Sequence, residues 1–224
     1  MAIAFVKNVG TGTGSNSTTA TITVPASGCA AGNTIVLRIT TDADRTISSI
    51  VDSGGNTYTQ WVSEVFNADD QWLYRSKLTT ALVSGNTIVV TLTAKDTWRA
   101  IAEEFSGLDA TENAENTATG TSATPSVSAT PTNANNLIVA HLVVGSSGYV
   151  VTEDGDSAGG DTWHTLTKSA RDCCAYKITT SAVAQTYNPT VNTSDAWGLQ
   201  LGSLTAPPAS LLWQPRSLVT AYQL

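Results

Sequence analysis

The segment Asp52-Ser53-Gly54-Gly55-Asn56-Thr57-Tyr58 recurs about a hundred residues further along the chain as Asp156-Ser157-Ala158-Gly159-Gly160-Asp161-Thr162-Trp163. Three other pairs of segments recur in the same order. They are residues 33–37 with 136–140, residues 77–80 with 177–180, and residues 96–98 with 195–197. This spacing is longer than the roughly 20 to 50 residues of solenoid repeats. The repeat therefore predicts two similar domains in tandem.

Polar and apolar residues alternate in short runs throughout both halves. In residues 19–24, for example, Ala20, Ile22 and Val24 alternate with threonines. A period of two residues is the pattern of a half-buried β-strand. About eight such runs in the first half, with turn signals roughly every ten residues, predict antiparallel β-sandwiches. We expect an all-β protein, and the sequence leaves open whether the sandwiches are jelly-roll or immunoglobulin-like.

The expected domain boundaries follow the composition of the chain. We expect residues 1–17 to form an N-terminal arm, residues 18–108 the first sandwich and residues 125–206 the second. Residues 109–124 contain no large apolar residue and are predicted to be a linker. Residues 207–224 are predicted to be an extended C-terminal tail.

This tail is apolar and carries one charged side chain, Arg216. Its candidate partner-binding residues are Leu211, Leu212, Trp213, Leu218, Val219, Tyr222 and Leu224. Solvated tails are rich in polar and charged residues. We therefore expect the tail either to pack on its own domain as a last strand, or to dock on a neighbouring subunit by strand addition or pocket filling.

Composition and charge exclude several classes of partner. The chain has 224 residues, of which 13% are charged, and a formal net charge of -7. Each half is long enough to bury a core without a metal or a disulfide. A negative net charge disfavours nucleic acid, because a phosphate backbone would be repelled. No segment approaches the length of a membrane span.

The N-terminal sequence and the cysteines indicate a reducing compartment. Residues 1–7 lack the basic and apolar regions of a signal peptide, so we expect synthesis in a cytoplasm. Cys29 stands alone, and Cys173 and Cys174 are neighbours that do not bridge easily. Disulfides are therefore not expected.

The sequence contains no strong catalytic signature. Glu103 and Glu104 are adjacent on a predicted strand, so their side chains should point to opposite faces, one of them to solvent. Such a pair cannot act together as acid and base across a cleft. His141 and His164 are the only histidines, and no Gly-x-Ser-x-Gly elbow lies beside them. We expect a non-enzymatic protein.

An acidic run around glycine turns offers a weak candidate calcium site. Its oxygen ligands would be Asp154, Asp156 and Asp161. The corresponding turn in the first half keeps a single acid, Asp52. A turn in which Asp and Asn side chains bond their own backbone is therefore the favoured interpretation.

Aromatic residues near predicted turns offer a candidate platform for stacking sugars. Its members are Trp61, Trp72 and Trp163, with Tyr149 nearby. The alternative interpretation is that these rings pack in the protein core, which is the usual role of aromatic residues at strand ends.

Three strings carry a resemblance to a known group of proteins. They are residues 50–58, Gly85-Asn86-Thr87-Ile88-Val89-Val90-Thr91, and Ala102-Glu103-Glu104-Phe105-Ser106-Gly107-Leu108-Asp109. They resemble a repeat of tailed-bacteriophage virion proteins and some bacterial surface proteins. The resemblance covers most of residues 18–205 and implies a β-sandwich that decorates a capsid or forms a head or tail appendage. The second half departs from it, with Gln200-Leu201-Gly202-Ser203-Leu204 in place of the last string.

The expected function follows from this resemblance. We expect a structural protein of a phage virion, assembled in the host cytoplasm, that binds the major capsid protein or other virion proteins as a decoration or cement protein. It is expected to form a homo-oligomer and to bind no nucleic acid and no membrane. The alternative is a carbohydrate-binding or receptor-binding appendage with a glycan as its ligand.

Overall fold

The computed structural model describes residues 2–67, 69–109, 111–146, 149–168 and 171–207. Within these ranges the fold is all-β, and every strand pairing is antiparallel. No helix in the described ranges is long and apolar enough to cross a membrane. The prediction of an all-β protein is therefore confirmed.

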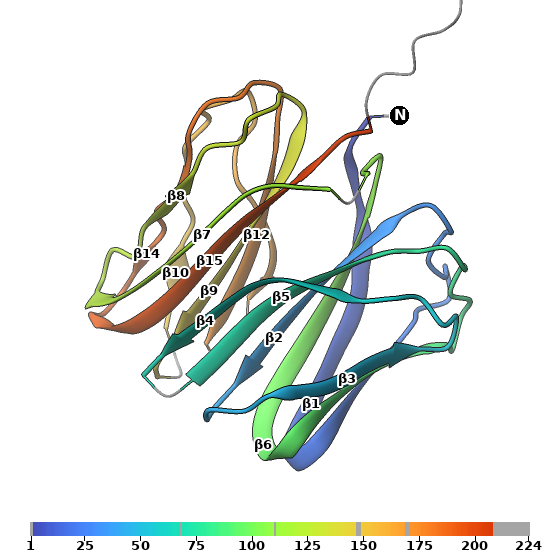
Figure 1. Ribbon diagram of the computed structural model, residues 1–224. Coiled ribbons are helices and arrows are strands. Elements are labelled where there is room, and N and C mark those ends of the chain that lie inside the picture. Colours follow the sequence, from blue (N-terminus) through green and yellow to red (C-terminus); the bar gives the residue numbers. More distant parts are fainter. Residues whose placement is uncertain (1, 68, 110, 147–148, 169–170, 208–224) are drawn as a thin grey trace, which may run out of the picture.

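The first half of the chain forms one large sheet. Its strands are β1 (Ala4–Thr23), β2 (Thr34–Thr41), β3 (Ile47–Asp52), β4 (Thr59–Phe66), β5 (Asp69–Lys77) and β6 (Thr87–Ser106). The strand order is β1-β6-β2-β5-β4, and β3 also pairs with β6. Both β1 and β6 are 20 residues long and run side by side as a ribbon (Figure 1).

The two ends of this ribbon belong to two different layers, which pack against each other. Residues 87–92 of β6 pair with β3 and with residues 19–23 of β1, whereas residues 98–106 pair with β2 and with the first part of β1. The apolar side chains between the two layers form what we call the N-terminal core. Its members include Ala20, Ile22, Ile35, Leu37, Ile39, Trp72, Ile88, Val90, Leu92, Trp98, Ala100 and Ala102. These are the alternating apolar positions, so burial follows the two-residue period.

The second half forms a five-stranded sheet and two short pairs. Its strands are β7 (Glu112–Ser122), β8 (Val127–Ala129), β9 (Asn136–Val144), β10 (Val151–Thr152), β11 (His164–Lys168), β12 (Asp172–Thr179), β13 (Gln185–Tyr187), β14 (Thr190–Val191) and β15 (Asp195–Thr205). The large sheet has the order β11-β12-β9-β15-β7, and the short pairs are β10-β14 and β13-β8. The short pairs cover one face of the large sheet. The C-terminal core between them includes Val127, Ile138, Ala140, Leu142, Trp163, Cys173, Tyr187, Val191, Trp197, Leu199 and Leu201.

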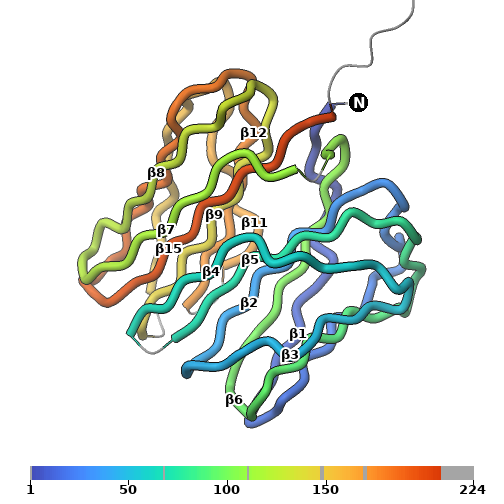
Figure 2. Tube along the Cα trace, viewed as in Figure 1, coloured from blue at the N-terminus to red at the C-terminus, as the bar shows by residue number. Residues whose placement is uncertain are grey.

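The two large sheets pack face to face through a third cluster, which we call the interlayer core. It includes Val36, Trp61, Leu73, Phe105, Leu137, Val139 and Leu204. Both β2 and β9 are buried at every position, because one face of each strand meets its own core and the other meets the opposite sheet. At one side of the stack β4 lies against β15 and β7 (Figure 2). The result is a stack of β-layers with three apolar clusters.

The structure corrects two of the expected boundaries. Residues 4–17, expected to be an arm, belong to β1, and residues 112–122, expected to be a linker, form β7. Small side chains in both segments allow close packing against neighbouring strands, so these residues do not form a flexible arm or linker. A Cβ on Gly12 would lie 2.8 Å from the backbone of Thr21, so glycine lets two parts of β1 pack together. In β7, which pairs with β15, Ala114 and Ala118 pack against the C-terminal core.

Candidate functional site

The interface between the two large sheets contains buried charged groups. Arg38 on β2 forms an ion pair with Glu103 on β6, and both side chains are 0% exposed. The Arg38 Nη2 atom also donates a hydrogen bond of 3.1 Å to the backbone oxygen of Ala175 on β12. Burial is the largest effect on the pKa of Arg38 and lowers it, but the charge and hydrogen bond of Glu103, together with smaller effects of Cys173 and Cys174, hold that pKa above its ordinary value. This arginine therefore ties the two halves together.

A second polar cluster lies between the sheets next to this ion pair. Thr40 Oγ1 donates a hydrogen bond of 2.7 Å to Asp172 Oδ1. His141 Nε2 lies 3.2 Å from the same oxygen and 3.3 Å from Thr40 Oγ1. Arg99 Nη1 completes the cluster at 2.7 Å from Asp172 Oδ2. Two of these residues come from β2 and β6 and two from β9 and β12, so the cluster also joins the halves.

The electrostatics of this cluster favour an ionised Asp172 and a neutral His141. Burial raises the pKa of Asp172, but the His141 hydrogen bond, the charge that His141 carries when protonated and the charge of Arg99 together outweigh it and lower that pKa to about 2. Burial is the largest effect on His141 and lowers its pKa, against the opposing effect of Asp172. Among the described residues, His141 Nδ1 has no hydrogen-bond partner. The contacts therefore place the histidine proton on Nε2.

This geometry differs from a nucleophile–histidine–carboxylate relay. In such a relay the hydroxyl and the carboxylate contact different ring nitrogens. Here Thr40 and Asp172 both contact Nε2 of His141. Thr40 is 2% exposed and His141 is 1% exposed, so neither group meets a substrate in this arrangement. The cluster positions the two sheets.

Further polar contacts join the two large sheets away from these clusters. Arg171 bonds Asp42 at 2.5 Å and also pairs with Asp69. Gln200 Nε2 donates a hydrogen bond of 2.9 Å to the backbone oxygen of Gln71. Each contact joins a residue of the second half to one of the first. The halves are therefore fixed by directional bonds as well as by apolar packing.

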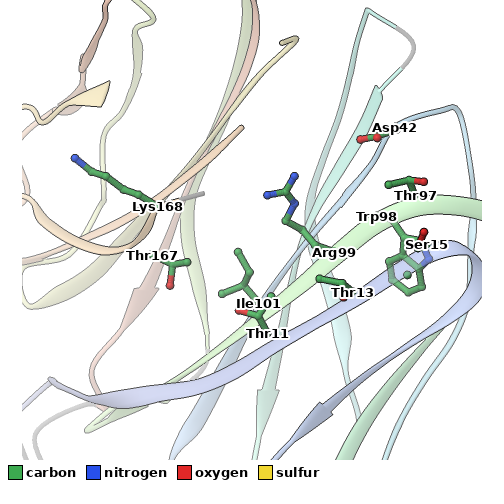
Figure 3. Close-up of a pocket in the computed structure, with 11 residues that line it drawn as sticks. Thr11, Thr13, Ser15, Asp42, Thr97, Trp98, Arg99, Ile101, Thr167 and Lys168 are labelled. Atoms are coloured by element: carbon green, nitrogen blue, oxygen red, sulfur yellow. The ribbon is translucent and has the colours of Figure 1, made fainter. Parts of the chain in front are cut away.

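A cleft of about 450 Å³ opens where the two sheets meet at the edges of β1 and β11. Thr11 and Thr13 line it from β1, Arg99 and Ile101 from β6, and Thr167 and Lys168 from β11 (Figure 3). Figure 3 shows Arg99 and Ile101 projecting from their strand toward the strand that carries Thr167 and Lys168. The two walls of the cleft therefore come from different halves of the chain.

The charges around this cleft are paired within the protein. Lys168 Nζ lies 2.7 Å from Glu153 Oε1 and 3.0 Å from the backbone oxygen of Val151. Arg99 pairs with Asp172, and Asp42 at the rim pairs with Arg171. A charged ligand would have to compete with these pairs. The cleft therefore favours a neutral occupant with its own hydrogen-bonding groups.

The predicted sugar platform is wrong for its three tryptophans. Trp61, Trp72 and Trp163 are 6%, 8% and 6% exposed and belong to the interlayer, N-terminal and C-terminal cores, respectively. Tyr149 is half-buried against the C-terminal core. The rings pack inward because each buries a large apolar area there.

The candidate calcium ligands are engaged separately in turns. Asp154 accepts hydrogen bonds from the backbone N–H groups of Asp156 and Asn188, and Asp161 accepts one from Thr162 and contacts His164. In the described part of the chain, no group of three or more His, Cys, Asp or Glu side chains could hold a metal ion. The prediction of calcium ligation by Asp154, Asp156 and Asp161 is therefore wrong. In the equivalent turn Asp52 accepts bonds from Gly54 and Asn56, as the turn interpretation predicts.

The remaining predictions have mixed outcomes. Glu103 and Glu104 do face opposite sides of β6, since Glu103 meets Arg38 and Glu104 pairs with Lys7 at 3.1 Å. The expectation that one of them faces solvent is wrong, because both are buried. Cys29, Cys173 and Cys174 are free and buried. The candidate partner-binding residues Leu211, Leu212, Trp213, Leu218, Val219, Tyr222 and Leu224 lie outside the described residues.

The residues that join the two sheets were not predicted from the sequence. Arg38 lies between Leu37 and Ile39 in a strand that is otherwise aliphatic over residues 35–39. A charged residue in the middle of such a strand signals a second buried face with a partner charge. No comparable signal marks Asp172, whose partners come from three other strands.

Comparison of the chain with protein-family models, with curated proteins and with solved structures finds no match.

Proposed function

We propose that this protein is a non-enzymatic structural protein of a tailed-phage virion, a decoration protein that binds the major capsid protein of the assembled head. The proposal combines the sequence resemblance with one structural observation, the ion pair of Arg38 and Glu103 between the two large sheets. Two sheets joined by buried directional bonds hold one arrangement, which suits a protein that acts through fixed contacts with a shell.

An internal duplication accounts for the arrangement of the body. In chain order, β1, β2, β4, β5 and β6 occupy the same places in their sheet as β7, β9, β11, β12 and β15 in theirs. Gly14 lies opposite Trp98 and Gly120 lies opposite Trp197 in the two first-to-last strand pairs. The repeated strand order and the repeated glycine–tryptophan pair support two sandwich-like domains derived from one ancestor.

This origin suits a protein that acts by adhesion. Many weak contacts repeated over a shell add up to firm binding. A protein that binds only the assembled shell stabilises that shell by mass action. The place of action would be the virion, after assembly in the host cytoplasm. The glycan-binding alternative loses its support, because its proposed platform is buried.

A binding experiment with phage heads tests the proposal. Heads are prepared from the phage that encodes this chain after deletion of its gene, and the purified full chain is added back. Saturable co-sedimentation at a fixed number of copies per head, with increased resistance of the heads to heat, is the expected result. Heads that neither bind the chain nor change in stability would overturn the proposed function.

A further inference from the structure

The cleft between β1 and β11 is bounded by two strand edges. Among the described strands each lies at the end of its sheet, so within the described part of the chain one side of its backbone has no neighbouring strand in that sheet. The register of β1 with β6 is regular from Gly10 to Gly14, between irregularities on either side. This stretch carries no charge and no proline, the features that usually protect an edge from strand addition. It is therefore an open edge.

The dimensions of the cleft suit one additional strand. Stacked sheets lie about 10 Å apart, and neighbouring strands in a sheet lie about 4.8 Å apart. The hydrogen-bonding groups of an edge strand point in the plane of its own sheet, so a strand added to the edge of β1 would extend the first sheet and meet the second sheet through side chains. At one end of the cleft the edges come within side-chain reach, where Asn8 Nδ2 lies 3.5 Å from the backbone oxygen of Leu166. Beyond this contact the edges separate around Thr11 and Thr13, whose side chains are exposed.

The chemistry of the walls points to an uncharged extended peptide. The hydroxyls of Thr11, Thr13 and Thr167 and the apolar side chain of Ile101 line the cleft, and the charged groups are paired. An added strand brings its own N–H and C=O groups to the open edge of β1. Such a strand can therefore bind through its backbone, without charged side chains.

The chain itself contains a segment of this type. Residues 217–223, Ser-Leu-Val-Thr-Ala-Tyr-Gln, have no charge, no glycine and no proline. Val219, Thr220 and Tyr222 are residues with high β-propensity. Nine residues separate this segment from the last described residue, Pro207.

We propose that the cleft between β1 and β11 accepts residues 217–223 of a second copy of this chain as an added β-strand. The inference rests on the proposed function as an assembly protein and deepens it, because it gives the copies a means of holding one another. Reciprocal exchange of the segment would give a closed dimer with twofold symmetry.

The second copy is a better occupant than the same molecule. Pro207 lines the same pocket as Ala2 and Ile3, and the end of the described chain lies near the N-terminus (Figure 1). The path from there to Thr11 is about 26 Å along a strand, and the ten Cα-to-Cα steps from Pro207 to Ser217 span about 33–36 Å at full extension. The segment of the same molecule could therefore reach the cleft only along an extended path, and it would run parallel to β1. A second copy can enter antiparallel, which is the slightly more stable pairing.

Two cysteine series test the proposal in the purified full chain. Thr13→Cys is combined with one cysteine at a time from position 217 to position 223, and each variant is oxidised mildly. The matched series replaces Thr13→Cys with Thr19→Cys, an exposed position of β1 outside the cleft. The native cysteines are buried, and burial raises the pKa of Cys29 to about 11, so they should not react. The readout is the covalent dimer on a non-reducing gel.

We expect dimers with Thr13→Cys at the position directly opposite it, and at most at the nearest positions on the same face, because a disulfide needs Cα atoms about 4.4–6.8 Å apart and side chains alternate along a strand; we expect none with Thr19→Cys. We also expect Thr11→Lys/Thr13→Lys to weaken dimerisation at least about tenfold in light scattering, whereas Thr19→Lys leaves it unchanged. A monomeric full chain, an association insensitive to the lysines, or a cross-link within one molecule would each overturn the proposal. None of these measurements involves a phage head, so failure here is distinguishable from failure of the proposed function.

Discussion

Arg38 and Glu103 form an ion pair that is 0% exposed and lies between two β-sheets, on the side of β2 that faces away from the N-terminal core. A buried pair of this kind is weak evidence for stability, but each charge requires the other, so the pair restricts how the sheets can pack. The same arginine bonds Ala175 of the opposite sheet. It thereby sets how the two halves face each other.

Loss of one partner of this pair should be costly. Arg38→Ala leaves the Glu103 carboxylate buried without its counter-charge, and we expect the free energy of unfolding to fall by about 3–5 kcal/mol. Chemical denaturation of the full chain measures the change. The double variant Arg38→Met/Glu103→Leu is the control and should recover most of the loss. An Arg38→Ala variant as stable as the wild type would contradict this account of the interface.

Stability should decline in two steps as pH falls. The pKa of His141 is lowered by burial in the folded state, so its contribution is complete above about pH 6.5 and is lost as pH falls through the folded pKa. The pKa of Asp172 is about 2 in the folded state, so its contribution is complete above about pH 4 and is lost toward pH 2. Urea denaturation from pH 8 to pH 2 measures both.

A histidine variant separates the two steps. His141→Gln should remove the first decline, between neutral pH and about pH 5, and leave a decline at lower pH. A pH profile of His141→Gln that matches the wild type throughout would show that His141 contributes nothing to the first step.

The glycines opposite the repeated tryptophans should resist substitution. A Cβ on Gly120 would lie 2.7 Å from Cζ2 of Trp197, and one on Gly14 would overlap the Trp98 ring. We expect Gly120→Ala to lower the free energy of unfolding by about 1–3 kcal/mol through overpacking. Gly155→Ala is the matched control, because a Cβ there meets nothing within 4 Å. Thermal unfolding compares the two, and equal midpoints would refute the packing argument.

Trp61 should act as a packing residue of the interlayer core. Trp61→Ala should cost about 3–5 kcal/mol of unfolding free energy, as expected for a buried tryptophan. Trp61→Phe should cost much less, because Trp61 Nε1 has no hydrogen-bond partner among the described residues. Denaturation measures both variants. Full stability of Trp61→Ala would indicate that the ring is exposed in solution and would reopen its role in ligand binding.

The strands could be predicted from the sequence because their signal is local. Alternation in residues 19–24 and 87–93 identifies the inward residues Ile22, Ile88 and Val90, all of which are 0% exposed. The turn at Asp52 was also predictable, since its side chain bonds backbone groups two and four residues away. Segments without large apolar residues misled the prediction. Residues 112–122 look like a linker by composition, although they pair with β15 as an edge strand.

Local sequence patterns were sufficient to identify the all-β class, the repeated segments and the strand residues that face the N-terminal and C-terminal cores. Alternation and turn chemistry are encoded within a few neighbouring residues. Only the folded structure shows that β2 and β9 also bury the faces that point away from the N-terminal and C-terminal cores. Arg38, Thr40, His141 and Asp172 are buried between the two sheets. These contacts join residues as far apart along the chain as Arg38 and Ala175, which are separated by 137 positions. Their partners come from separate strands, and no local pattern specifies which faces of two sheets will pack together.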